Sequence, residues 1–212
     1  MKKYFFLVLM CFGTASICSS QATKQIFSSP SLSATLAKAK TVAILPFNVA
    51  ISYKKMPKGV TVENIREDEK KEGPQMQQGM YTFLLRKMND YSVTFQDVER
   101  TNALLKKAGL IDNLNETLAD SLCKILGVDA VIKSSWSYAK TGSEAGAIAT
   151  ALVFGVSKGV GSGQLVMQIY DGNSGEMVWR MAKEMNESVY SSANELMERM
   201  MRKVGRNFPF EK

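Results

Sequence analysis

Apolar positions repeat along the chain with two different periods: alternation at every second residue predicts strands, and spacings of three and four predict helices. The apolar run over 41–47 continues in alternating form to residue 53, which is typical of a buried strand. Pro46 cannot donate to a sheet hydrogen bond, so this strand is expected to bulge or to meet a sheet edge there. The charged stretch 54–73 that follows is interpreted as an excursion into solvent.

Four later segments repeat apolar residues at spacings of three and four, which predicts helices. These segments are 74–88, 97–109, 114–126 and 188–206. Pro74 suits a first helical position, Asp97 is a helix cap, and Gly127 is a natural stop. Short apolar runs over 91–95 and 128–138 predict two more strands.

A hairpin is predicted near the C-terminus. Strands over 164–170 and 176–184 flank the stretch Asp171-Gly172-Asn173-Ser174-Gly175, whose residues tolerate positive φ or bond their own backbone. The order of elements predicts a single α/β domain with a mixed five-stranded sheet, mostly β-α-β followed by this hairpin and flanked by helices.

Both ends of the predicted domain are expected to lie outside the sheet. Residues 23–40 are polar and rich in serine and alanine, and they are expected to form a flexible N-terminal tether. Residues 207–212 are expected to be a C-terminal tail. The folded part is therefore predicted to span 41–206.

The first 22 residues have the three parts of a secretory signal peptide. Lys2 and Lys3 precede an apolar core of about ten residues, and small residues follow. Cleavage after Ala22 fits the rule for small residues at the exit. Lipidation of Cys18 is the alternative, and a retained helix is the third, although the core is too short to span a bilayer. We expect an exported protein of the periplasm or cell envelope, and an outer-membrane lipoprotein if Cys18 is modified.

Composition narrows the chemistry that the chain can perform. The formal net charge is +7, and the surplus of about five that remains without the leader is spread along the chain. This pattern indicates weak attraction to anionic surfaces and gives no case for nucleic acid. The sequence has no histidine, which excludes His-containing zinc sites and Ser-His-Asp or Cys-His catalysis. Cys123 is interpreted as a small buried hydrophobe.

The remaining candidate groups are interpreted as structural. The carboxylates of the stretch 54–73 alternate with cations, which predicts a solvated segment: Glu67, Asp68, Glu69 and Glu72. The glycine-rich stretch 159–163 lacks the Gly-Lys-Ser/Thr ending of a phosphate loop. Six of the thirteen methionines stand at helical spacing and are expected to pack in the core: Met76, Met80, Met88, Met197, Met200 and Met201. We assign no catalytic residue, metal, cofactor or small-molecule substrate.

Three motifs follow one another in a recognisable order: TVAILPF (41–47), ILGVDAVI (125–132) and QIYDGNSGEMVW (168–179). Together they resemble the bacterial envelope superfamily that includes the N-terminal domain of TolB and the periplasmic domain of the curli-secretion (CsgG-like) lipoprotein. The matching positions are Phe47, Asp97, Gly127, Asp129, Ala130, Asp171, Gly175, Glu176 and Trp179. The resemblance implies a non-enzymatic envelope component that works through protein contacts, sometimes as an oligomer, and many relatives are lipoproteins.

The stretch 143–163, SEAGAIATALVFGVSKGVGSG, has only two charged residues, Glu144 and Lys158. Small residues recur there every four positions, which would let a helix approach a neighbouring helix closely. The same small residues stand at odd-numbered positions, so a strand pair would have one small and one bulky face, as in membrane hairpins. Ser143 and Gly159 bound a helix of about fifteen residues, which at ~1.5 Å per residue is too short to span a membrane. The apolar surface of this helix must be shielded from water. Three alternatives would do this: packing on the sheet of the same domain, contact with a second copy or a partner protein, or shallow insertion into a membrane.

These observations predict a non-enzymatic, exported envelope protein that binds or assembles through protein contacts, with self-association as one form of partner. The candidate interface consists of apolar and small residues of that stretch: Ala147, Ile148, Ala151, Leu152, Phe154, Gly155 and Val156. Two alternatives stay open. One is a membrane-associated oligomer built through 144–163, in contact with the outer membrane, and the other is a hydrolase that works without histidine.

Overall fold

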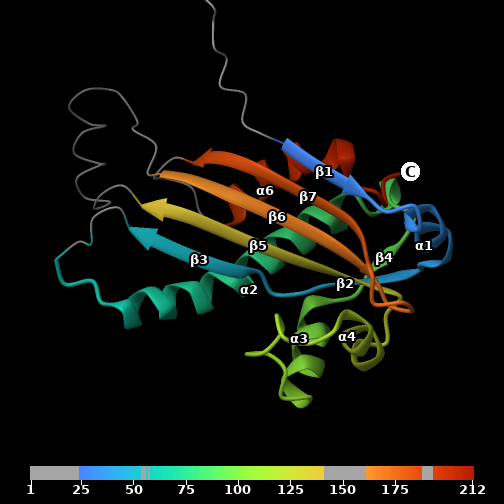
Figure 1. Cartoon of the computed structure of the whole chain (residues 1–212), viewed down its shortest axis with the longest axis horizontal. Coiled ribbons are helices and arrows are strands. Elements are labelled where there is room, and N and C mark those ends of the chain that lie inside the picture. Colours follow the sequence, from blue (N-terminus) through green and yellow to red (C-terminus); the bar gives the residue numbers. More distant parts are fainter. Residues whose placement is uncertain (1–23, 54–55, 57, 141–160, 188–192) are drawn as a thin grey trace, which may run out of the picture.

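A mixed seven-stranded sheet organises the protein, with helices on both of its faces (Figure 1). The structure is a computed structural model that describes residues 24–53, 56, 58–140, 161–187 and 193–212. The strands are β1 (Lys24–Ser28), β2 (Thr41–Ile44), β3 (Asn48–Tyr53), β4 (Thr94–Phe95), β5 (Ala130–Lys140), β6 (Gly161–Asp171) and β7 (Met177–Glu187). The predicted mixed α/β domain is confirmed, but the predicted count of five strands is too low.

The sheet order is β1-β7-β6-β5-β2-β4, and β3 also pairs with β5. Strands β2 and β3 both run parallel to β5, one after the other along it. Ile44 lies opposite Ile132 and Asn48 opposite Ser135, so the 41–53 segment contains one residue more than β5 over the same distance. The bulge predicted at Pro46 is therefore present, because a residue without an N–H cannot continue the ladder.

The other half of the sheet is antiparallel, from β5 through β6 and β7 to β1. The predicted hairpin is confirmed: Asp171 accepts a hydrogen bond from the Ser174 backbone at 2.8 Å, and Gly175 has a φ of 74°. Strand β1 adds to the hairpin along β7, and helix α1 (Leu32–Lys38) follows it. These two elements occupy most of 23–40, where a flexible tether was expected.

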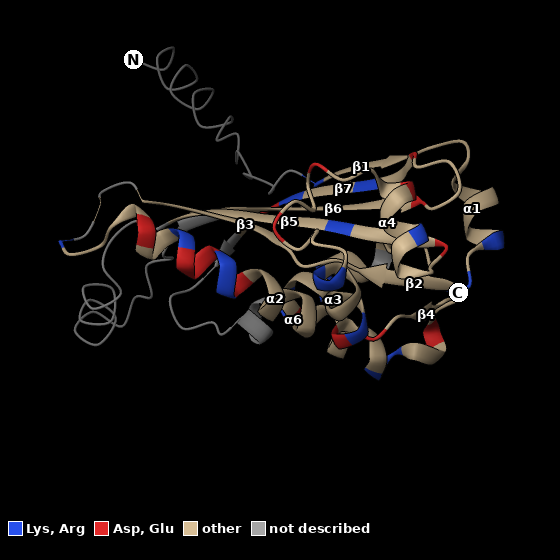
Figure 2. Ribbon diagram, turned by 90° about the horizontal axis from the view of Figure 1, so that it is seen from below, with Lys and Arg blue, Asp and Glu red and all other residues tan. Residues whose placement is uncertain are grey.

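Helix α2 (Val62–Arg86) begins twelve residues before the expected start at Pro74, which lies inside it. Thr61 caps it, since its side chain accepts from the Asn64 backbone and the Asn64 side chain accepts from the Thr61 backbone. Acidic and basic residues alternate along its N-terminal half (Figure 2). The expectation of a charged excursion into solvent was wrong from residue 62 onward, because these residues form a helix that rests on the sheet and has most of its charges on the solvent side.

The other helical elements agree better with the sequence patterns. They are η1 (Met88–Asp90), α3 (Val98–Lys107), α4 (Ala119–Leu126), α6 (Ala193–Val204) and η2 (Gly205–Asn207). Asp97 caps α3 by accepting from the Arg100 backbone, and Gly127 ends α4 in the left-handed conformation with φ 66°. Among the helices in the described part of the chain, none combines the length and the apolar character needed to cross a membrane.

Helices α2 and α6 cover one face of the sheet, below it in Figure 2, and enclose the larger core. Trp136 and Trp179 are fully buried there, together with five of the six methionines at helical spacing, whereas Met88 is exposed. Phe208 and Phe210 are also buried, so the C-terminal residues pack in this core instead of forming the expected tail.

Helices α3 and α4 cover only one end of the opposite face, around a smaller core that includes Leu45, Leu122 and Val131. The rest of that face, toward the far ends of β3, β5 and β6, has no described helix over it (Figure 1). Serine and glutamine side chains alternate outward here, such as Ser137 opposite Gln164. The protein is thus a sheet with one complete and one partial helical layer.

Candidate functional site

The interface predicted from sequence, from Ala147 to Val156, and the lipidation candidate Cys18 lie outside the residues that the structure describes. Strands β5 and β6, which flank residues 141–160, are antiparallel neighbours with Tyr138 opposite Gly163. Strand β5 therefore ends and strand β6 begins at the same end of the sheet, where β3 and β7 also end (Figure 1).

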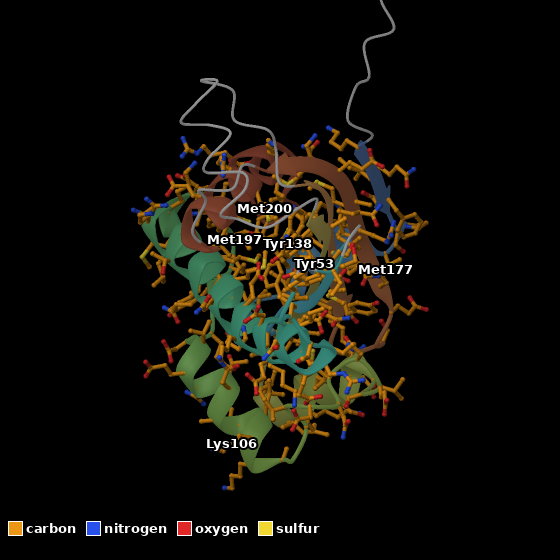
Figure 3. The ribbon with its side chains drawn as sticks, turned by 90° about the vertical axis from the view of Figure 1, so that its left-hand side faces the viewer. Tyr53, Lys106, Tyr138, Met177, Met197 and Met200 are labelled. Atoms are coloured by element: carbon orange, nitrogen blue, oxygen red, sulfur yellow. The ribbon has the colours of Figure 1, made fainter. Side chains whose placement is uncertain are left out.

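The glycine-rich sequence that leads into β6 is strand at its described end, not a phosphate loop. A side chain at Gly163 would run into the indole ring of Trp136 on the neighbouring strand. Trp136 also stacks on Tyr138, with ring centroids 5.7 Å apart. Tyr138 and Tyr53 lie near each other at this end of the sheet (Figure 3). Glycine is thus used here to make room for an aromatic layer.

Two carboxylates that were expected to be solvated instead tie α2 to the sheet. The Ile51 backbone donates to Glu69 Oε1 at 2.7 Å, and the Tyr138 hydroxyl donates to Glu72 Oε2 at 3.0 Å. Burial, and next the charge of Glu72, raise the pKa of Tyr138 above its ordinary range. This phenol is therefore neutral at physiological pH and acts as a hydrogen-bond donor.

A groove of about 490 Å³ opens where the strand break meets α2 and α3. We call it the break groove. The residues that line it come from the strand break, α2, α3 and the segment after α3: Pro46, Phe47, Asn48, Val49, Arg66, Glu69, Lys70, Gly73, Pro74, Asn102, Lys106, Ile111, Asp112, Leu114 and Asn115. Its size lies within the range of ordinary ligand pockets.

Two hydrogen-bonded amides, the fully buried Gln77 and the partly buried Asn102, lie beside the break groove. Gln77 donates to the Ile44 carbonyl at 2.7 Å and to Asn102 at 3.1 Å, and Asn102 donates back to Gln77 at 2.9 Å. Gln77 is fully buried, so these bonds replace its contacts with water. They join β2, α2 and α3, the elements around the groove.

Lys133 supports the outer wall of the groove, formed by the segment between α3 and α4. Its ammonium donates to the carbonyls of Leu114 and Thr117 at 3.2 and 2.8 Å, and it lies 5.6 Å from the centre of the Tyr170 ring. Burial lowers the pKa of Lys133. This lysine is therefore a structural cation, whereas Lys106 projects from α3 near the edge of the molecule (Figure 3).

The outer edge of the sheet is a second candidate surface. Strand β1 is exposed at all five residues and ends the sheet, paired only with β7 among the described strands. Ile26 and Phe27 are 40% and 48% exposed, one on each face of the strand. Phe27 lies opposite Arg180 of β7. Exposed neighbouring apolar residues on an unpaired edge are a typical surface for strand addition.

The other reactive groups belong to the core or to turns. Cys123 is 2% exposed, and burial, together with nearby carboxylates, raises the pKa of its thiol to about 12. Asp129 accepts from the backbones of Lys40 and Thr41 at 2.8 and 2.9 Å, a strand-start role that its position in the motif predicts. Within the described ranges, no group of three or more histidine, cysteine or acidic side chains is arranged to hold a metal.

Comparison with protein-family models gives no match, and comparison with curated proteins gives none either. Three solved structures illustrate the fold similarity. The PelC dodecamer of Paraburkholderia phytofirmans is 13% identical, with 90% of this chain and 98% of that chain covered and a TM-score of 0.43. A lipoprotein of Neisseria meningitidis is 12% identical, with 79% and 96% covered and a TM-score of 0.47. The C-terminal domain of LpoB from Salmonella enterica is 16% identical, with 74% and 94% covered and a TM-score of 0.37.

None of these three is TolB or the curli-secretion lipoprotein, so that finer resemblance stays a prediction. With identities of 12–16% and TM-scores no higher than 0.47, the similarities assign no function to this chain.

Sequence reasoning missed both surfaces that the structure presents. The break groove had one signal in the sequence, the prolines at positions 46 and 74, but nothing local placed them against each other. The β1 edge had none, because the sequence KQIFS shows no clear alternation and was absorbed into a polar stretch.

Proposed function

We propose that this chain is a non-enzymatic component of the bacterial cell envelope that works by binding a protein, either another copy of itself or a different envelope protein. The exposed edge of β1 carries this proposal. Its unpaired backbone offers hydrogen bonds to an incoming strand, and Ile26 and Phe27 offer apolar contact on both faces.

The non-enzymatic part of the proposal is supported by the hydrogen bonds of the carboxylate and amide side chains, which go to other groups of the protein. The carboxylates of Glu69 and Asp129 accept backbone N–H groups, and the amides of Gln77 and Asn102 bond each other. Acid-base chemistry needs such groups directed toward a substrate, whereas here they hold elements together.

The envelope location is supported by the leader and by the place of the first described strand. Strand β1 starts at Lys24, two residues after the proposed cleavage site at Ala22. If Cys18 carries the lipid instead, the six residues to Lys24 reach at most about 20 Å, at ~3.5 Å per residue. A lipidated protein would therefore hold the β1 edge close to the membrane surface. Intact mass spectrometry of the purified native protein distinguishes an N-terminus at Thr23 from a lipidated Cys18.

Site-specific crosslinking tests the proposed binding surface. The photo-crosslinking amino acid p-benzoylphenylalanine replaces Phe27 in the full chain, and Thr82, an exposed residue of α2, serves as the matched control position. We expect illumination of cells to give a discrete larger band from position 27 and none from position 82. Equal crosslinking at the two positions, or none at position 27, contradicts the proposal.

The apolar stretch 144–158 is a second part of the proposed contact surface, and a turn replacement tests it. The register of β5 and β6, continued from Tyr138 and Gly163, sets Lys140 opposite Gly161. Replacing 141–160 by Asn-Gly therefore closes a two-residue hairpin. If the stretch serves only contacts between molecules, the variant stays soluble and folded, and light scattering shows a smaller particle than the parent. Insoluble protein would indicate that the stretch completes the core.

A further inference from the structure

The break groove has the chemistry of a peptide-binding site, and we propose that it binds an extended peptide segment with acidic side chains, contributed by a partner protein. This inference rests on the proposed function, because it names the kind of partner segment that a protein-binding envelope component would receive. It concerns a different surface from the β1 edge.

Backbone donors at alternate residues from Phe47 into β3 point away from β5 and toward α2. Phe47 donates to the Gly73 carbonyl at 3.3 Å and Ile51 donates to Glu69 at 2.7 Å, both away from β5. Strand residues alternate in direction, so the N–H of Val49, between them, points the same way. Val49 lines the groove, and its N–H has no partner among the described residues. The groove therefore presents a strand-edge donor for an incoming carbonyl or carboxylate.

The charge of the lining favours an anionic ligand. Three cations line the groove, Arg66, Lys70 and Lys106, and all three are exposed. Two carboxylates also line the groove, Asp112 and Glu69, which accepts the Ile51 N–H, so three cations against two carboxylates leave the lining with a net charge of +1. Arg66 has only a 3.7 Å contact with exposed Glu63, which stabilises little at a surface.

The break groove also has apolar surface and amide side chains, which separates it from a site for a small inorganic anion. Pro46, Pro74 and Ile111 line it beside the amides of Asn48 and Asn115. Amides can donate to and accept from a peptide backbone, and prolines and isoleucine can contact apolar side chains. Alternating apolar and acidic residues in an extended segment would match these features, since successive side chains point to opposite sides.

Fluorescence anisotropy with designed peptides tests the inference on the full mature chain. The probe is a fluorescein-labelled, N-acetylated hexapeptide of alternating leucine and aspartate, and the same hexapeptides with asparagine or lysine in place of aspartate are the controls. We expect the aspartate peptide to bind at least tenfold more tightly than the asparagine peptide, and the lysine peptide not to bind. Binding should weaken as salt is raised, because the groove cations are exposed.

A matched pair of charge reversals locates the site. Lys106 lines the groove, whereas its neighbour Lys107 is also exposed but lies outside the lining. Lys106→Glu should weaken binding of the aspartate peptide at least tenfold, and Lys107→Glu, with the same net charge, should change it less than twofold. Circular dichroism checks that both variants are folded.

Three results would overturn the inference: no binding of the aspartate peptide up to about 1 mM, equal binding of the asparagine peptide, or equal loss in Lys106→Glu and Lys107→Glu. The last would mean that overall charge attracts the peptide. Crosslinking at Phe27 with no peptide binding would reject this inference and leave the proposed function standing. Peptide binding without crosslinking at Phe27 would reject the β1 edge alone.

Discussion

Gly73 is the point at which α2 touches the strand break, and Gly73→Ala should destabilise the protein although it lies inside a helix. Alanine is normally the better helix residue by about 1 kcal/mol, so the substitution would stabilise an uncrowded helix. Here a Cβ atom at position 73 would lie inside the van der Waals distance of the Phe47 carbonyl oxygen. A backbone oxygen cannot rotate away, so α2 or the strand break must move.

The expected size follows from these opposing effects. Overpacking in a tight site costs about 1–3 kcal/mol, and the helix gain offsets about 1 kcal/mol of it. We therefore expect a net loss of about 1 kcal/mol, or about 2–4 °C in melting temperature for a chain of this length. The shift also lengthens the 3.3 Å bond from Phe47 to Gly73, so peptide binding in the break groove should weaken as well.

Urea and thermal unfolding followed by circular dichroism measure the effect on the mature chain. Gly205→Ala is the control, since no atom lies within 4 Å of a Cβ built at that residue and its φ is not positive. The control should be neutral or slightly stabilised. If Gly73→Ala raised stability by about 1 kcal/mol, helix propensity alone would decide at this position and the close contact with Phe47 would be refuted.

Three further outcomes are expected from groups in the core. Gln77→Leu should lose about 1–3 kcal/mol in urea unfolding, because it leaves the Ile44 carbonyl and the Asn102 amide without their partner; an unchanged midpoint would contradict this role. In the chain that begins at Thr23, Cys123 should not react with Ellman's reagent at pH 8 until urea unfolds the protein, because the thiol is buried and its pKa is raised to about 12. Rapid labelling of the folded chain would contradict this expectation, because it would show that the thiol is accessible. Burial raises the pKa of Tyr91 from 10.0 to about 12, so the neutral phenol favours the folded state, and its contribution to stability should be full below pH 10 and fall as the pH rises toward 12. Tyr91→Phe should make this fall in stability with pH shallower. An unaltered slope of stability against pH would contradict the role of Tyr91.

Local patterns predicted well wherever a feature depends on neighbours in the chain. Asp97 caps α3, Gly127 ends α4, and Asp171 bonds the turn of the hairpin, each through atoms a few residues away. The bulge at Pro46 was predictable for the same reason, since proline lacks the donor whichever strand lies beside it.

Features held by distant partners were not predictable from local patterns. Strand β1 is exposed along its whole length and owes its conformation to backbone bonds with β7, more than 150 residues later in the chain. The first half of α2 looks like a solvated stretch until Glu69 and Glu72 are seen to reach Ile51 and Tyr138.

By itself, the sequence determined the class of the fold, the capped helix ends, the hairpin and the absence of histidine chemistry, because each follows from periodicity, local hydrogen bonding or residue type. Only the tertiary structure decided the addition of β1, the division of 41–53 into β2 and β3, the course of α2 and the break groove. The groove exists because Pro46 interrupts a strand where Gly73 lets a helix approach it, and Gln77 and Asn102 join the two. Contacts between segments so far apart in the chain arise from packing, which no local pattern encodes.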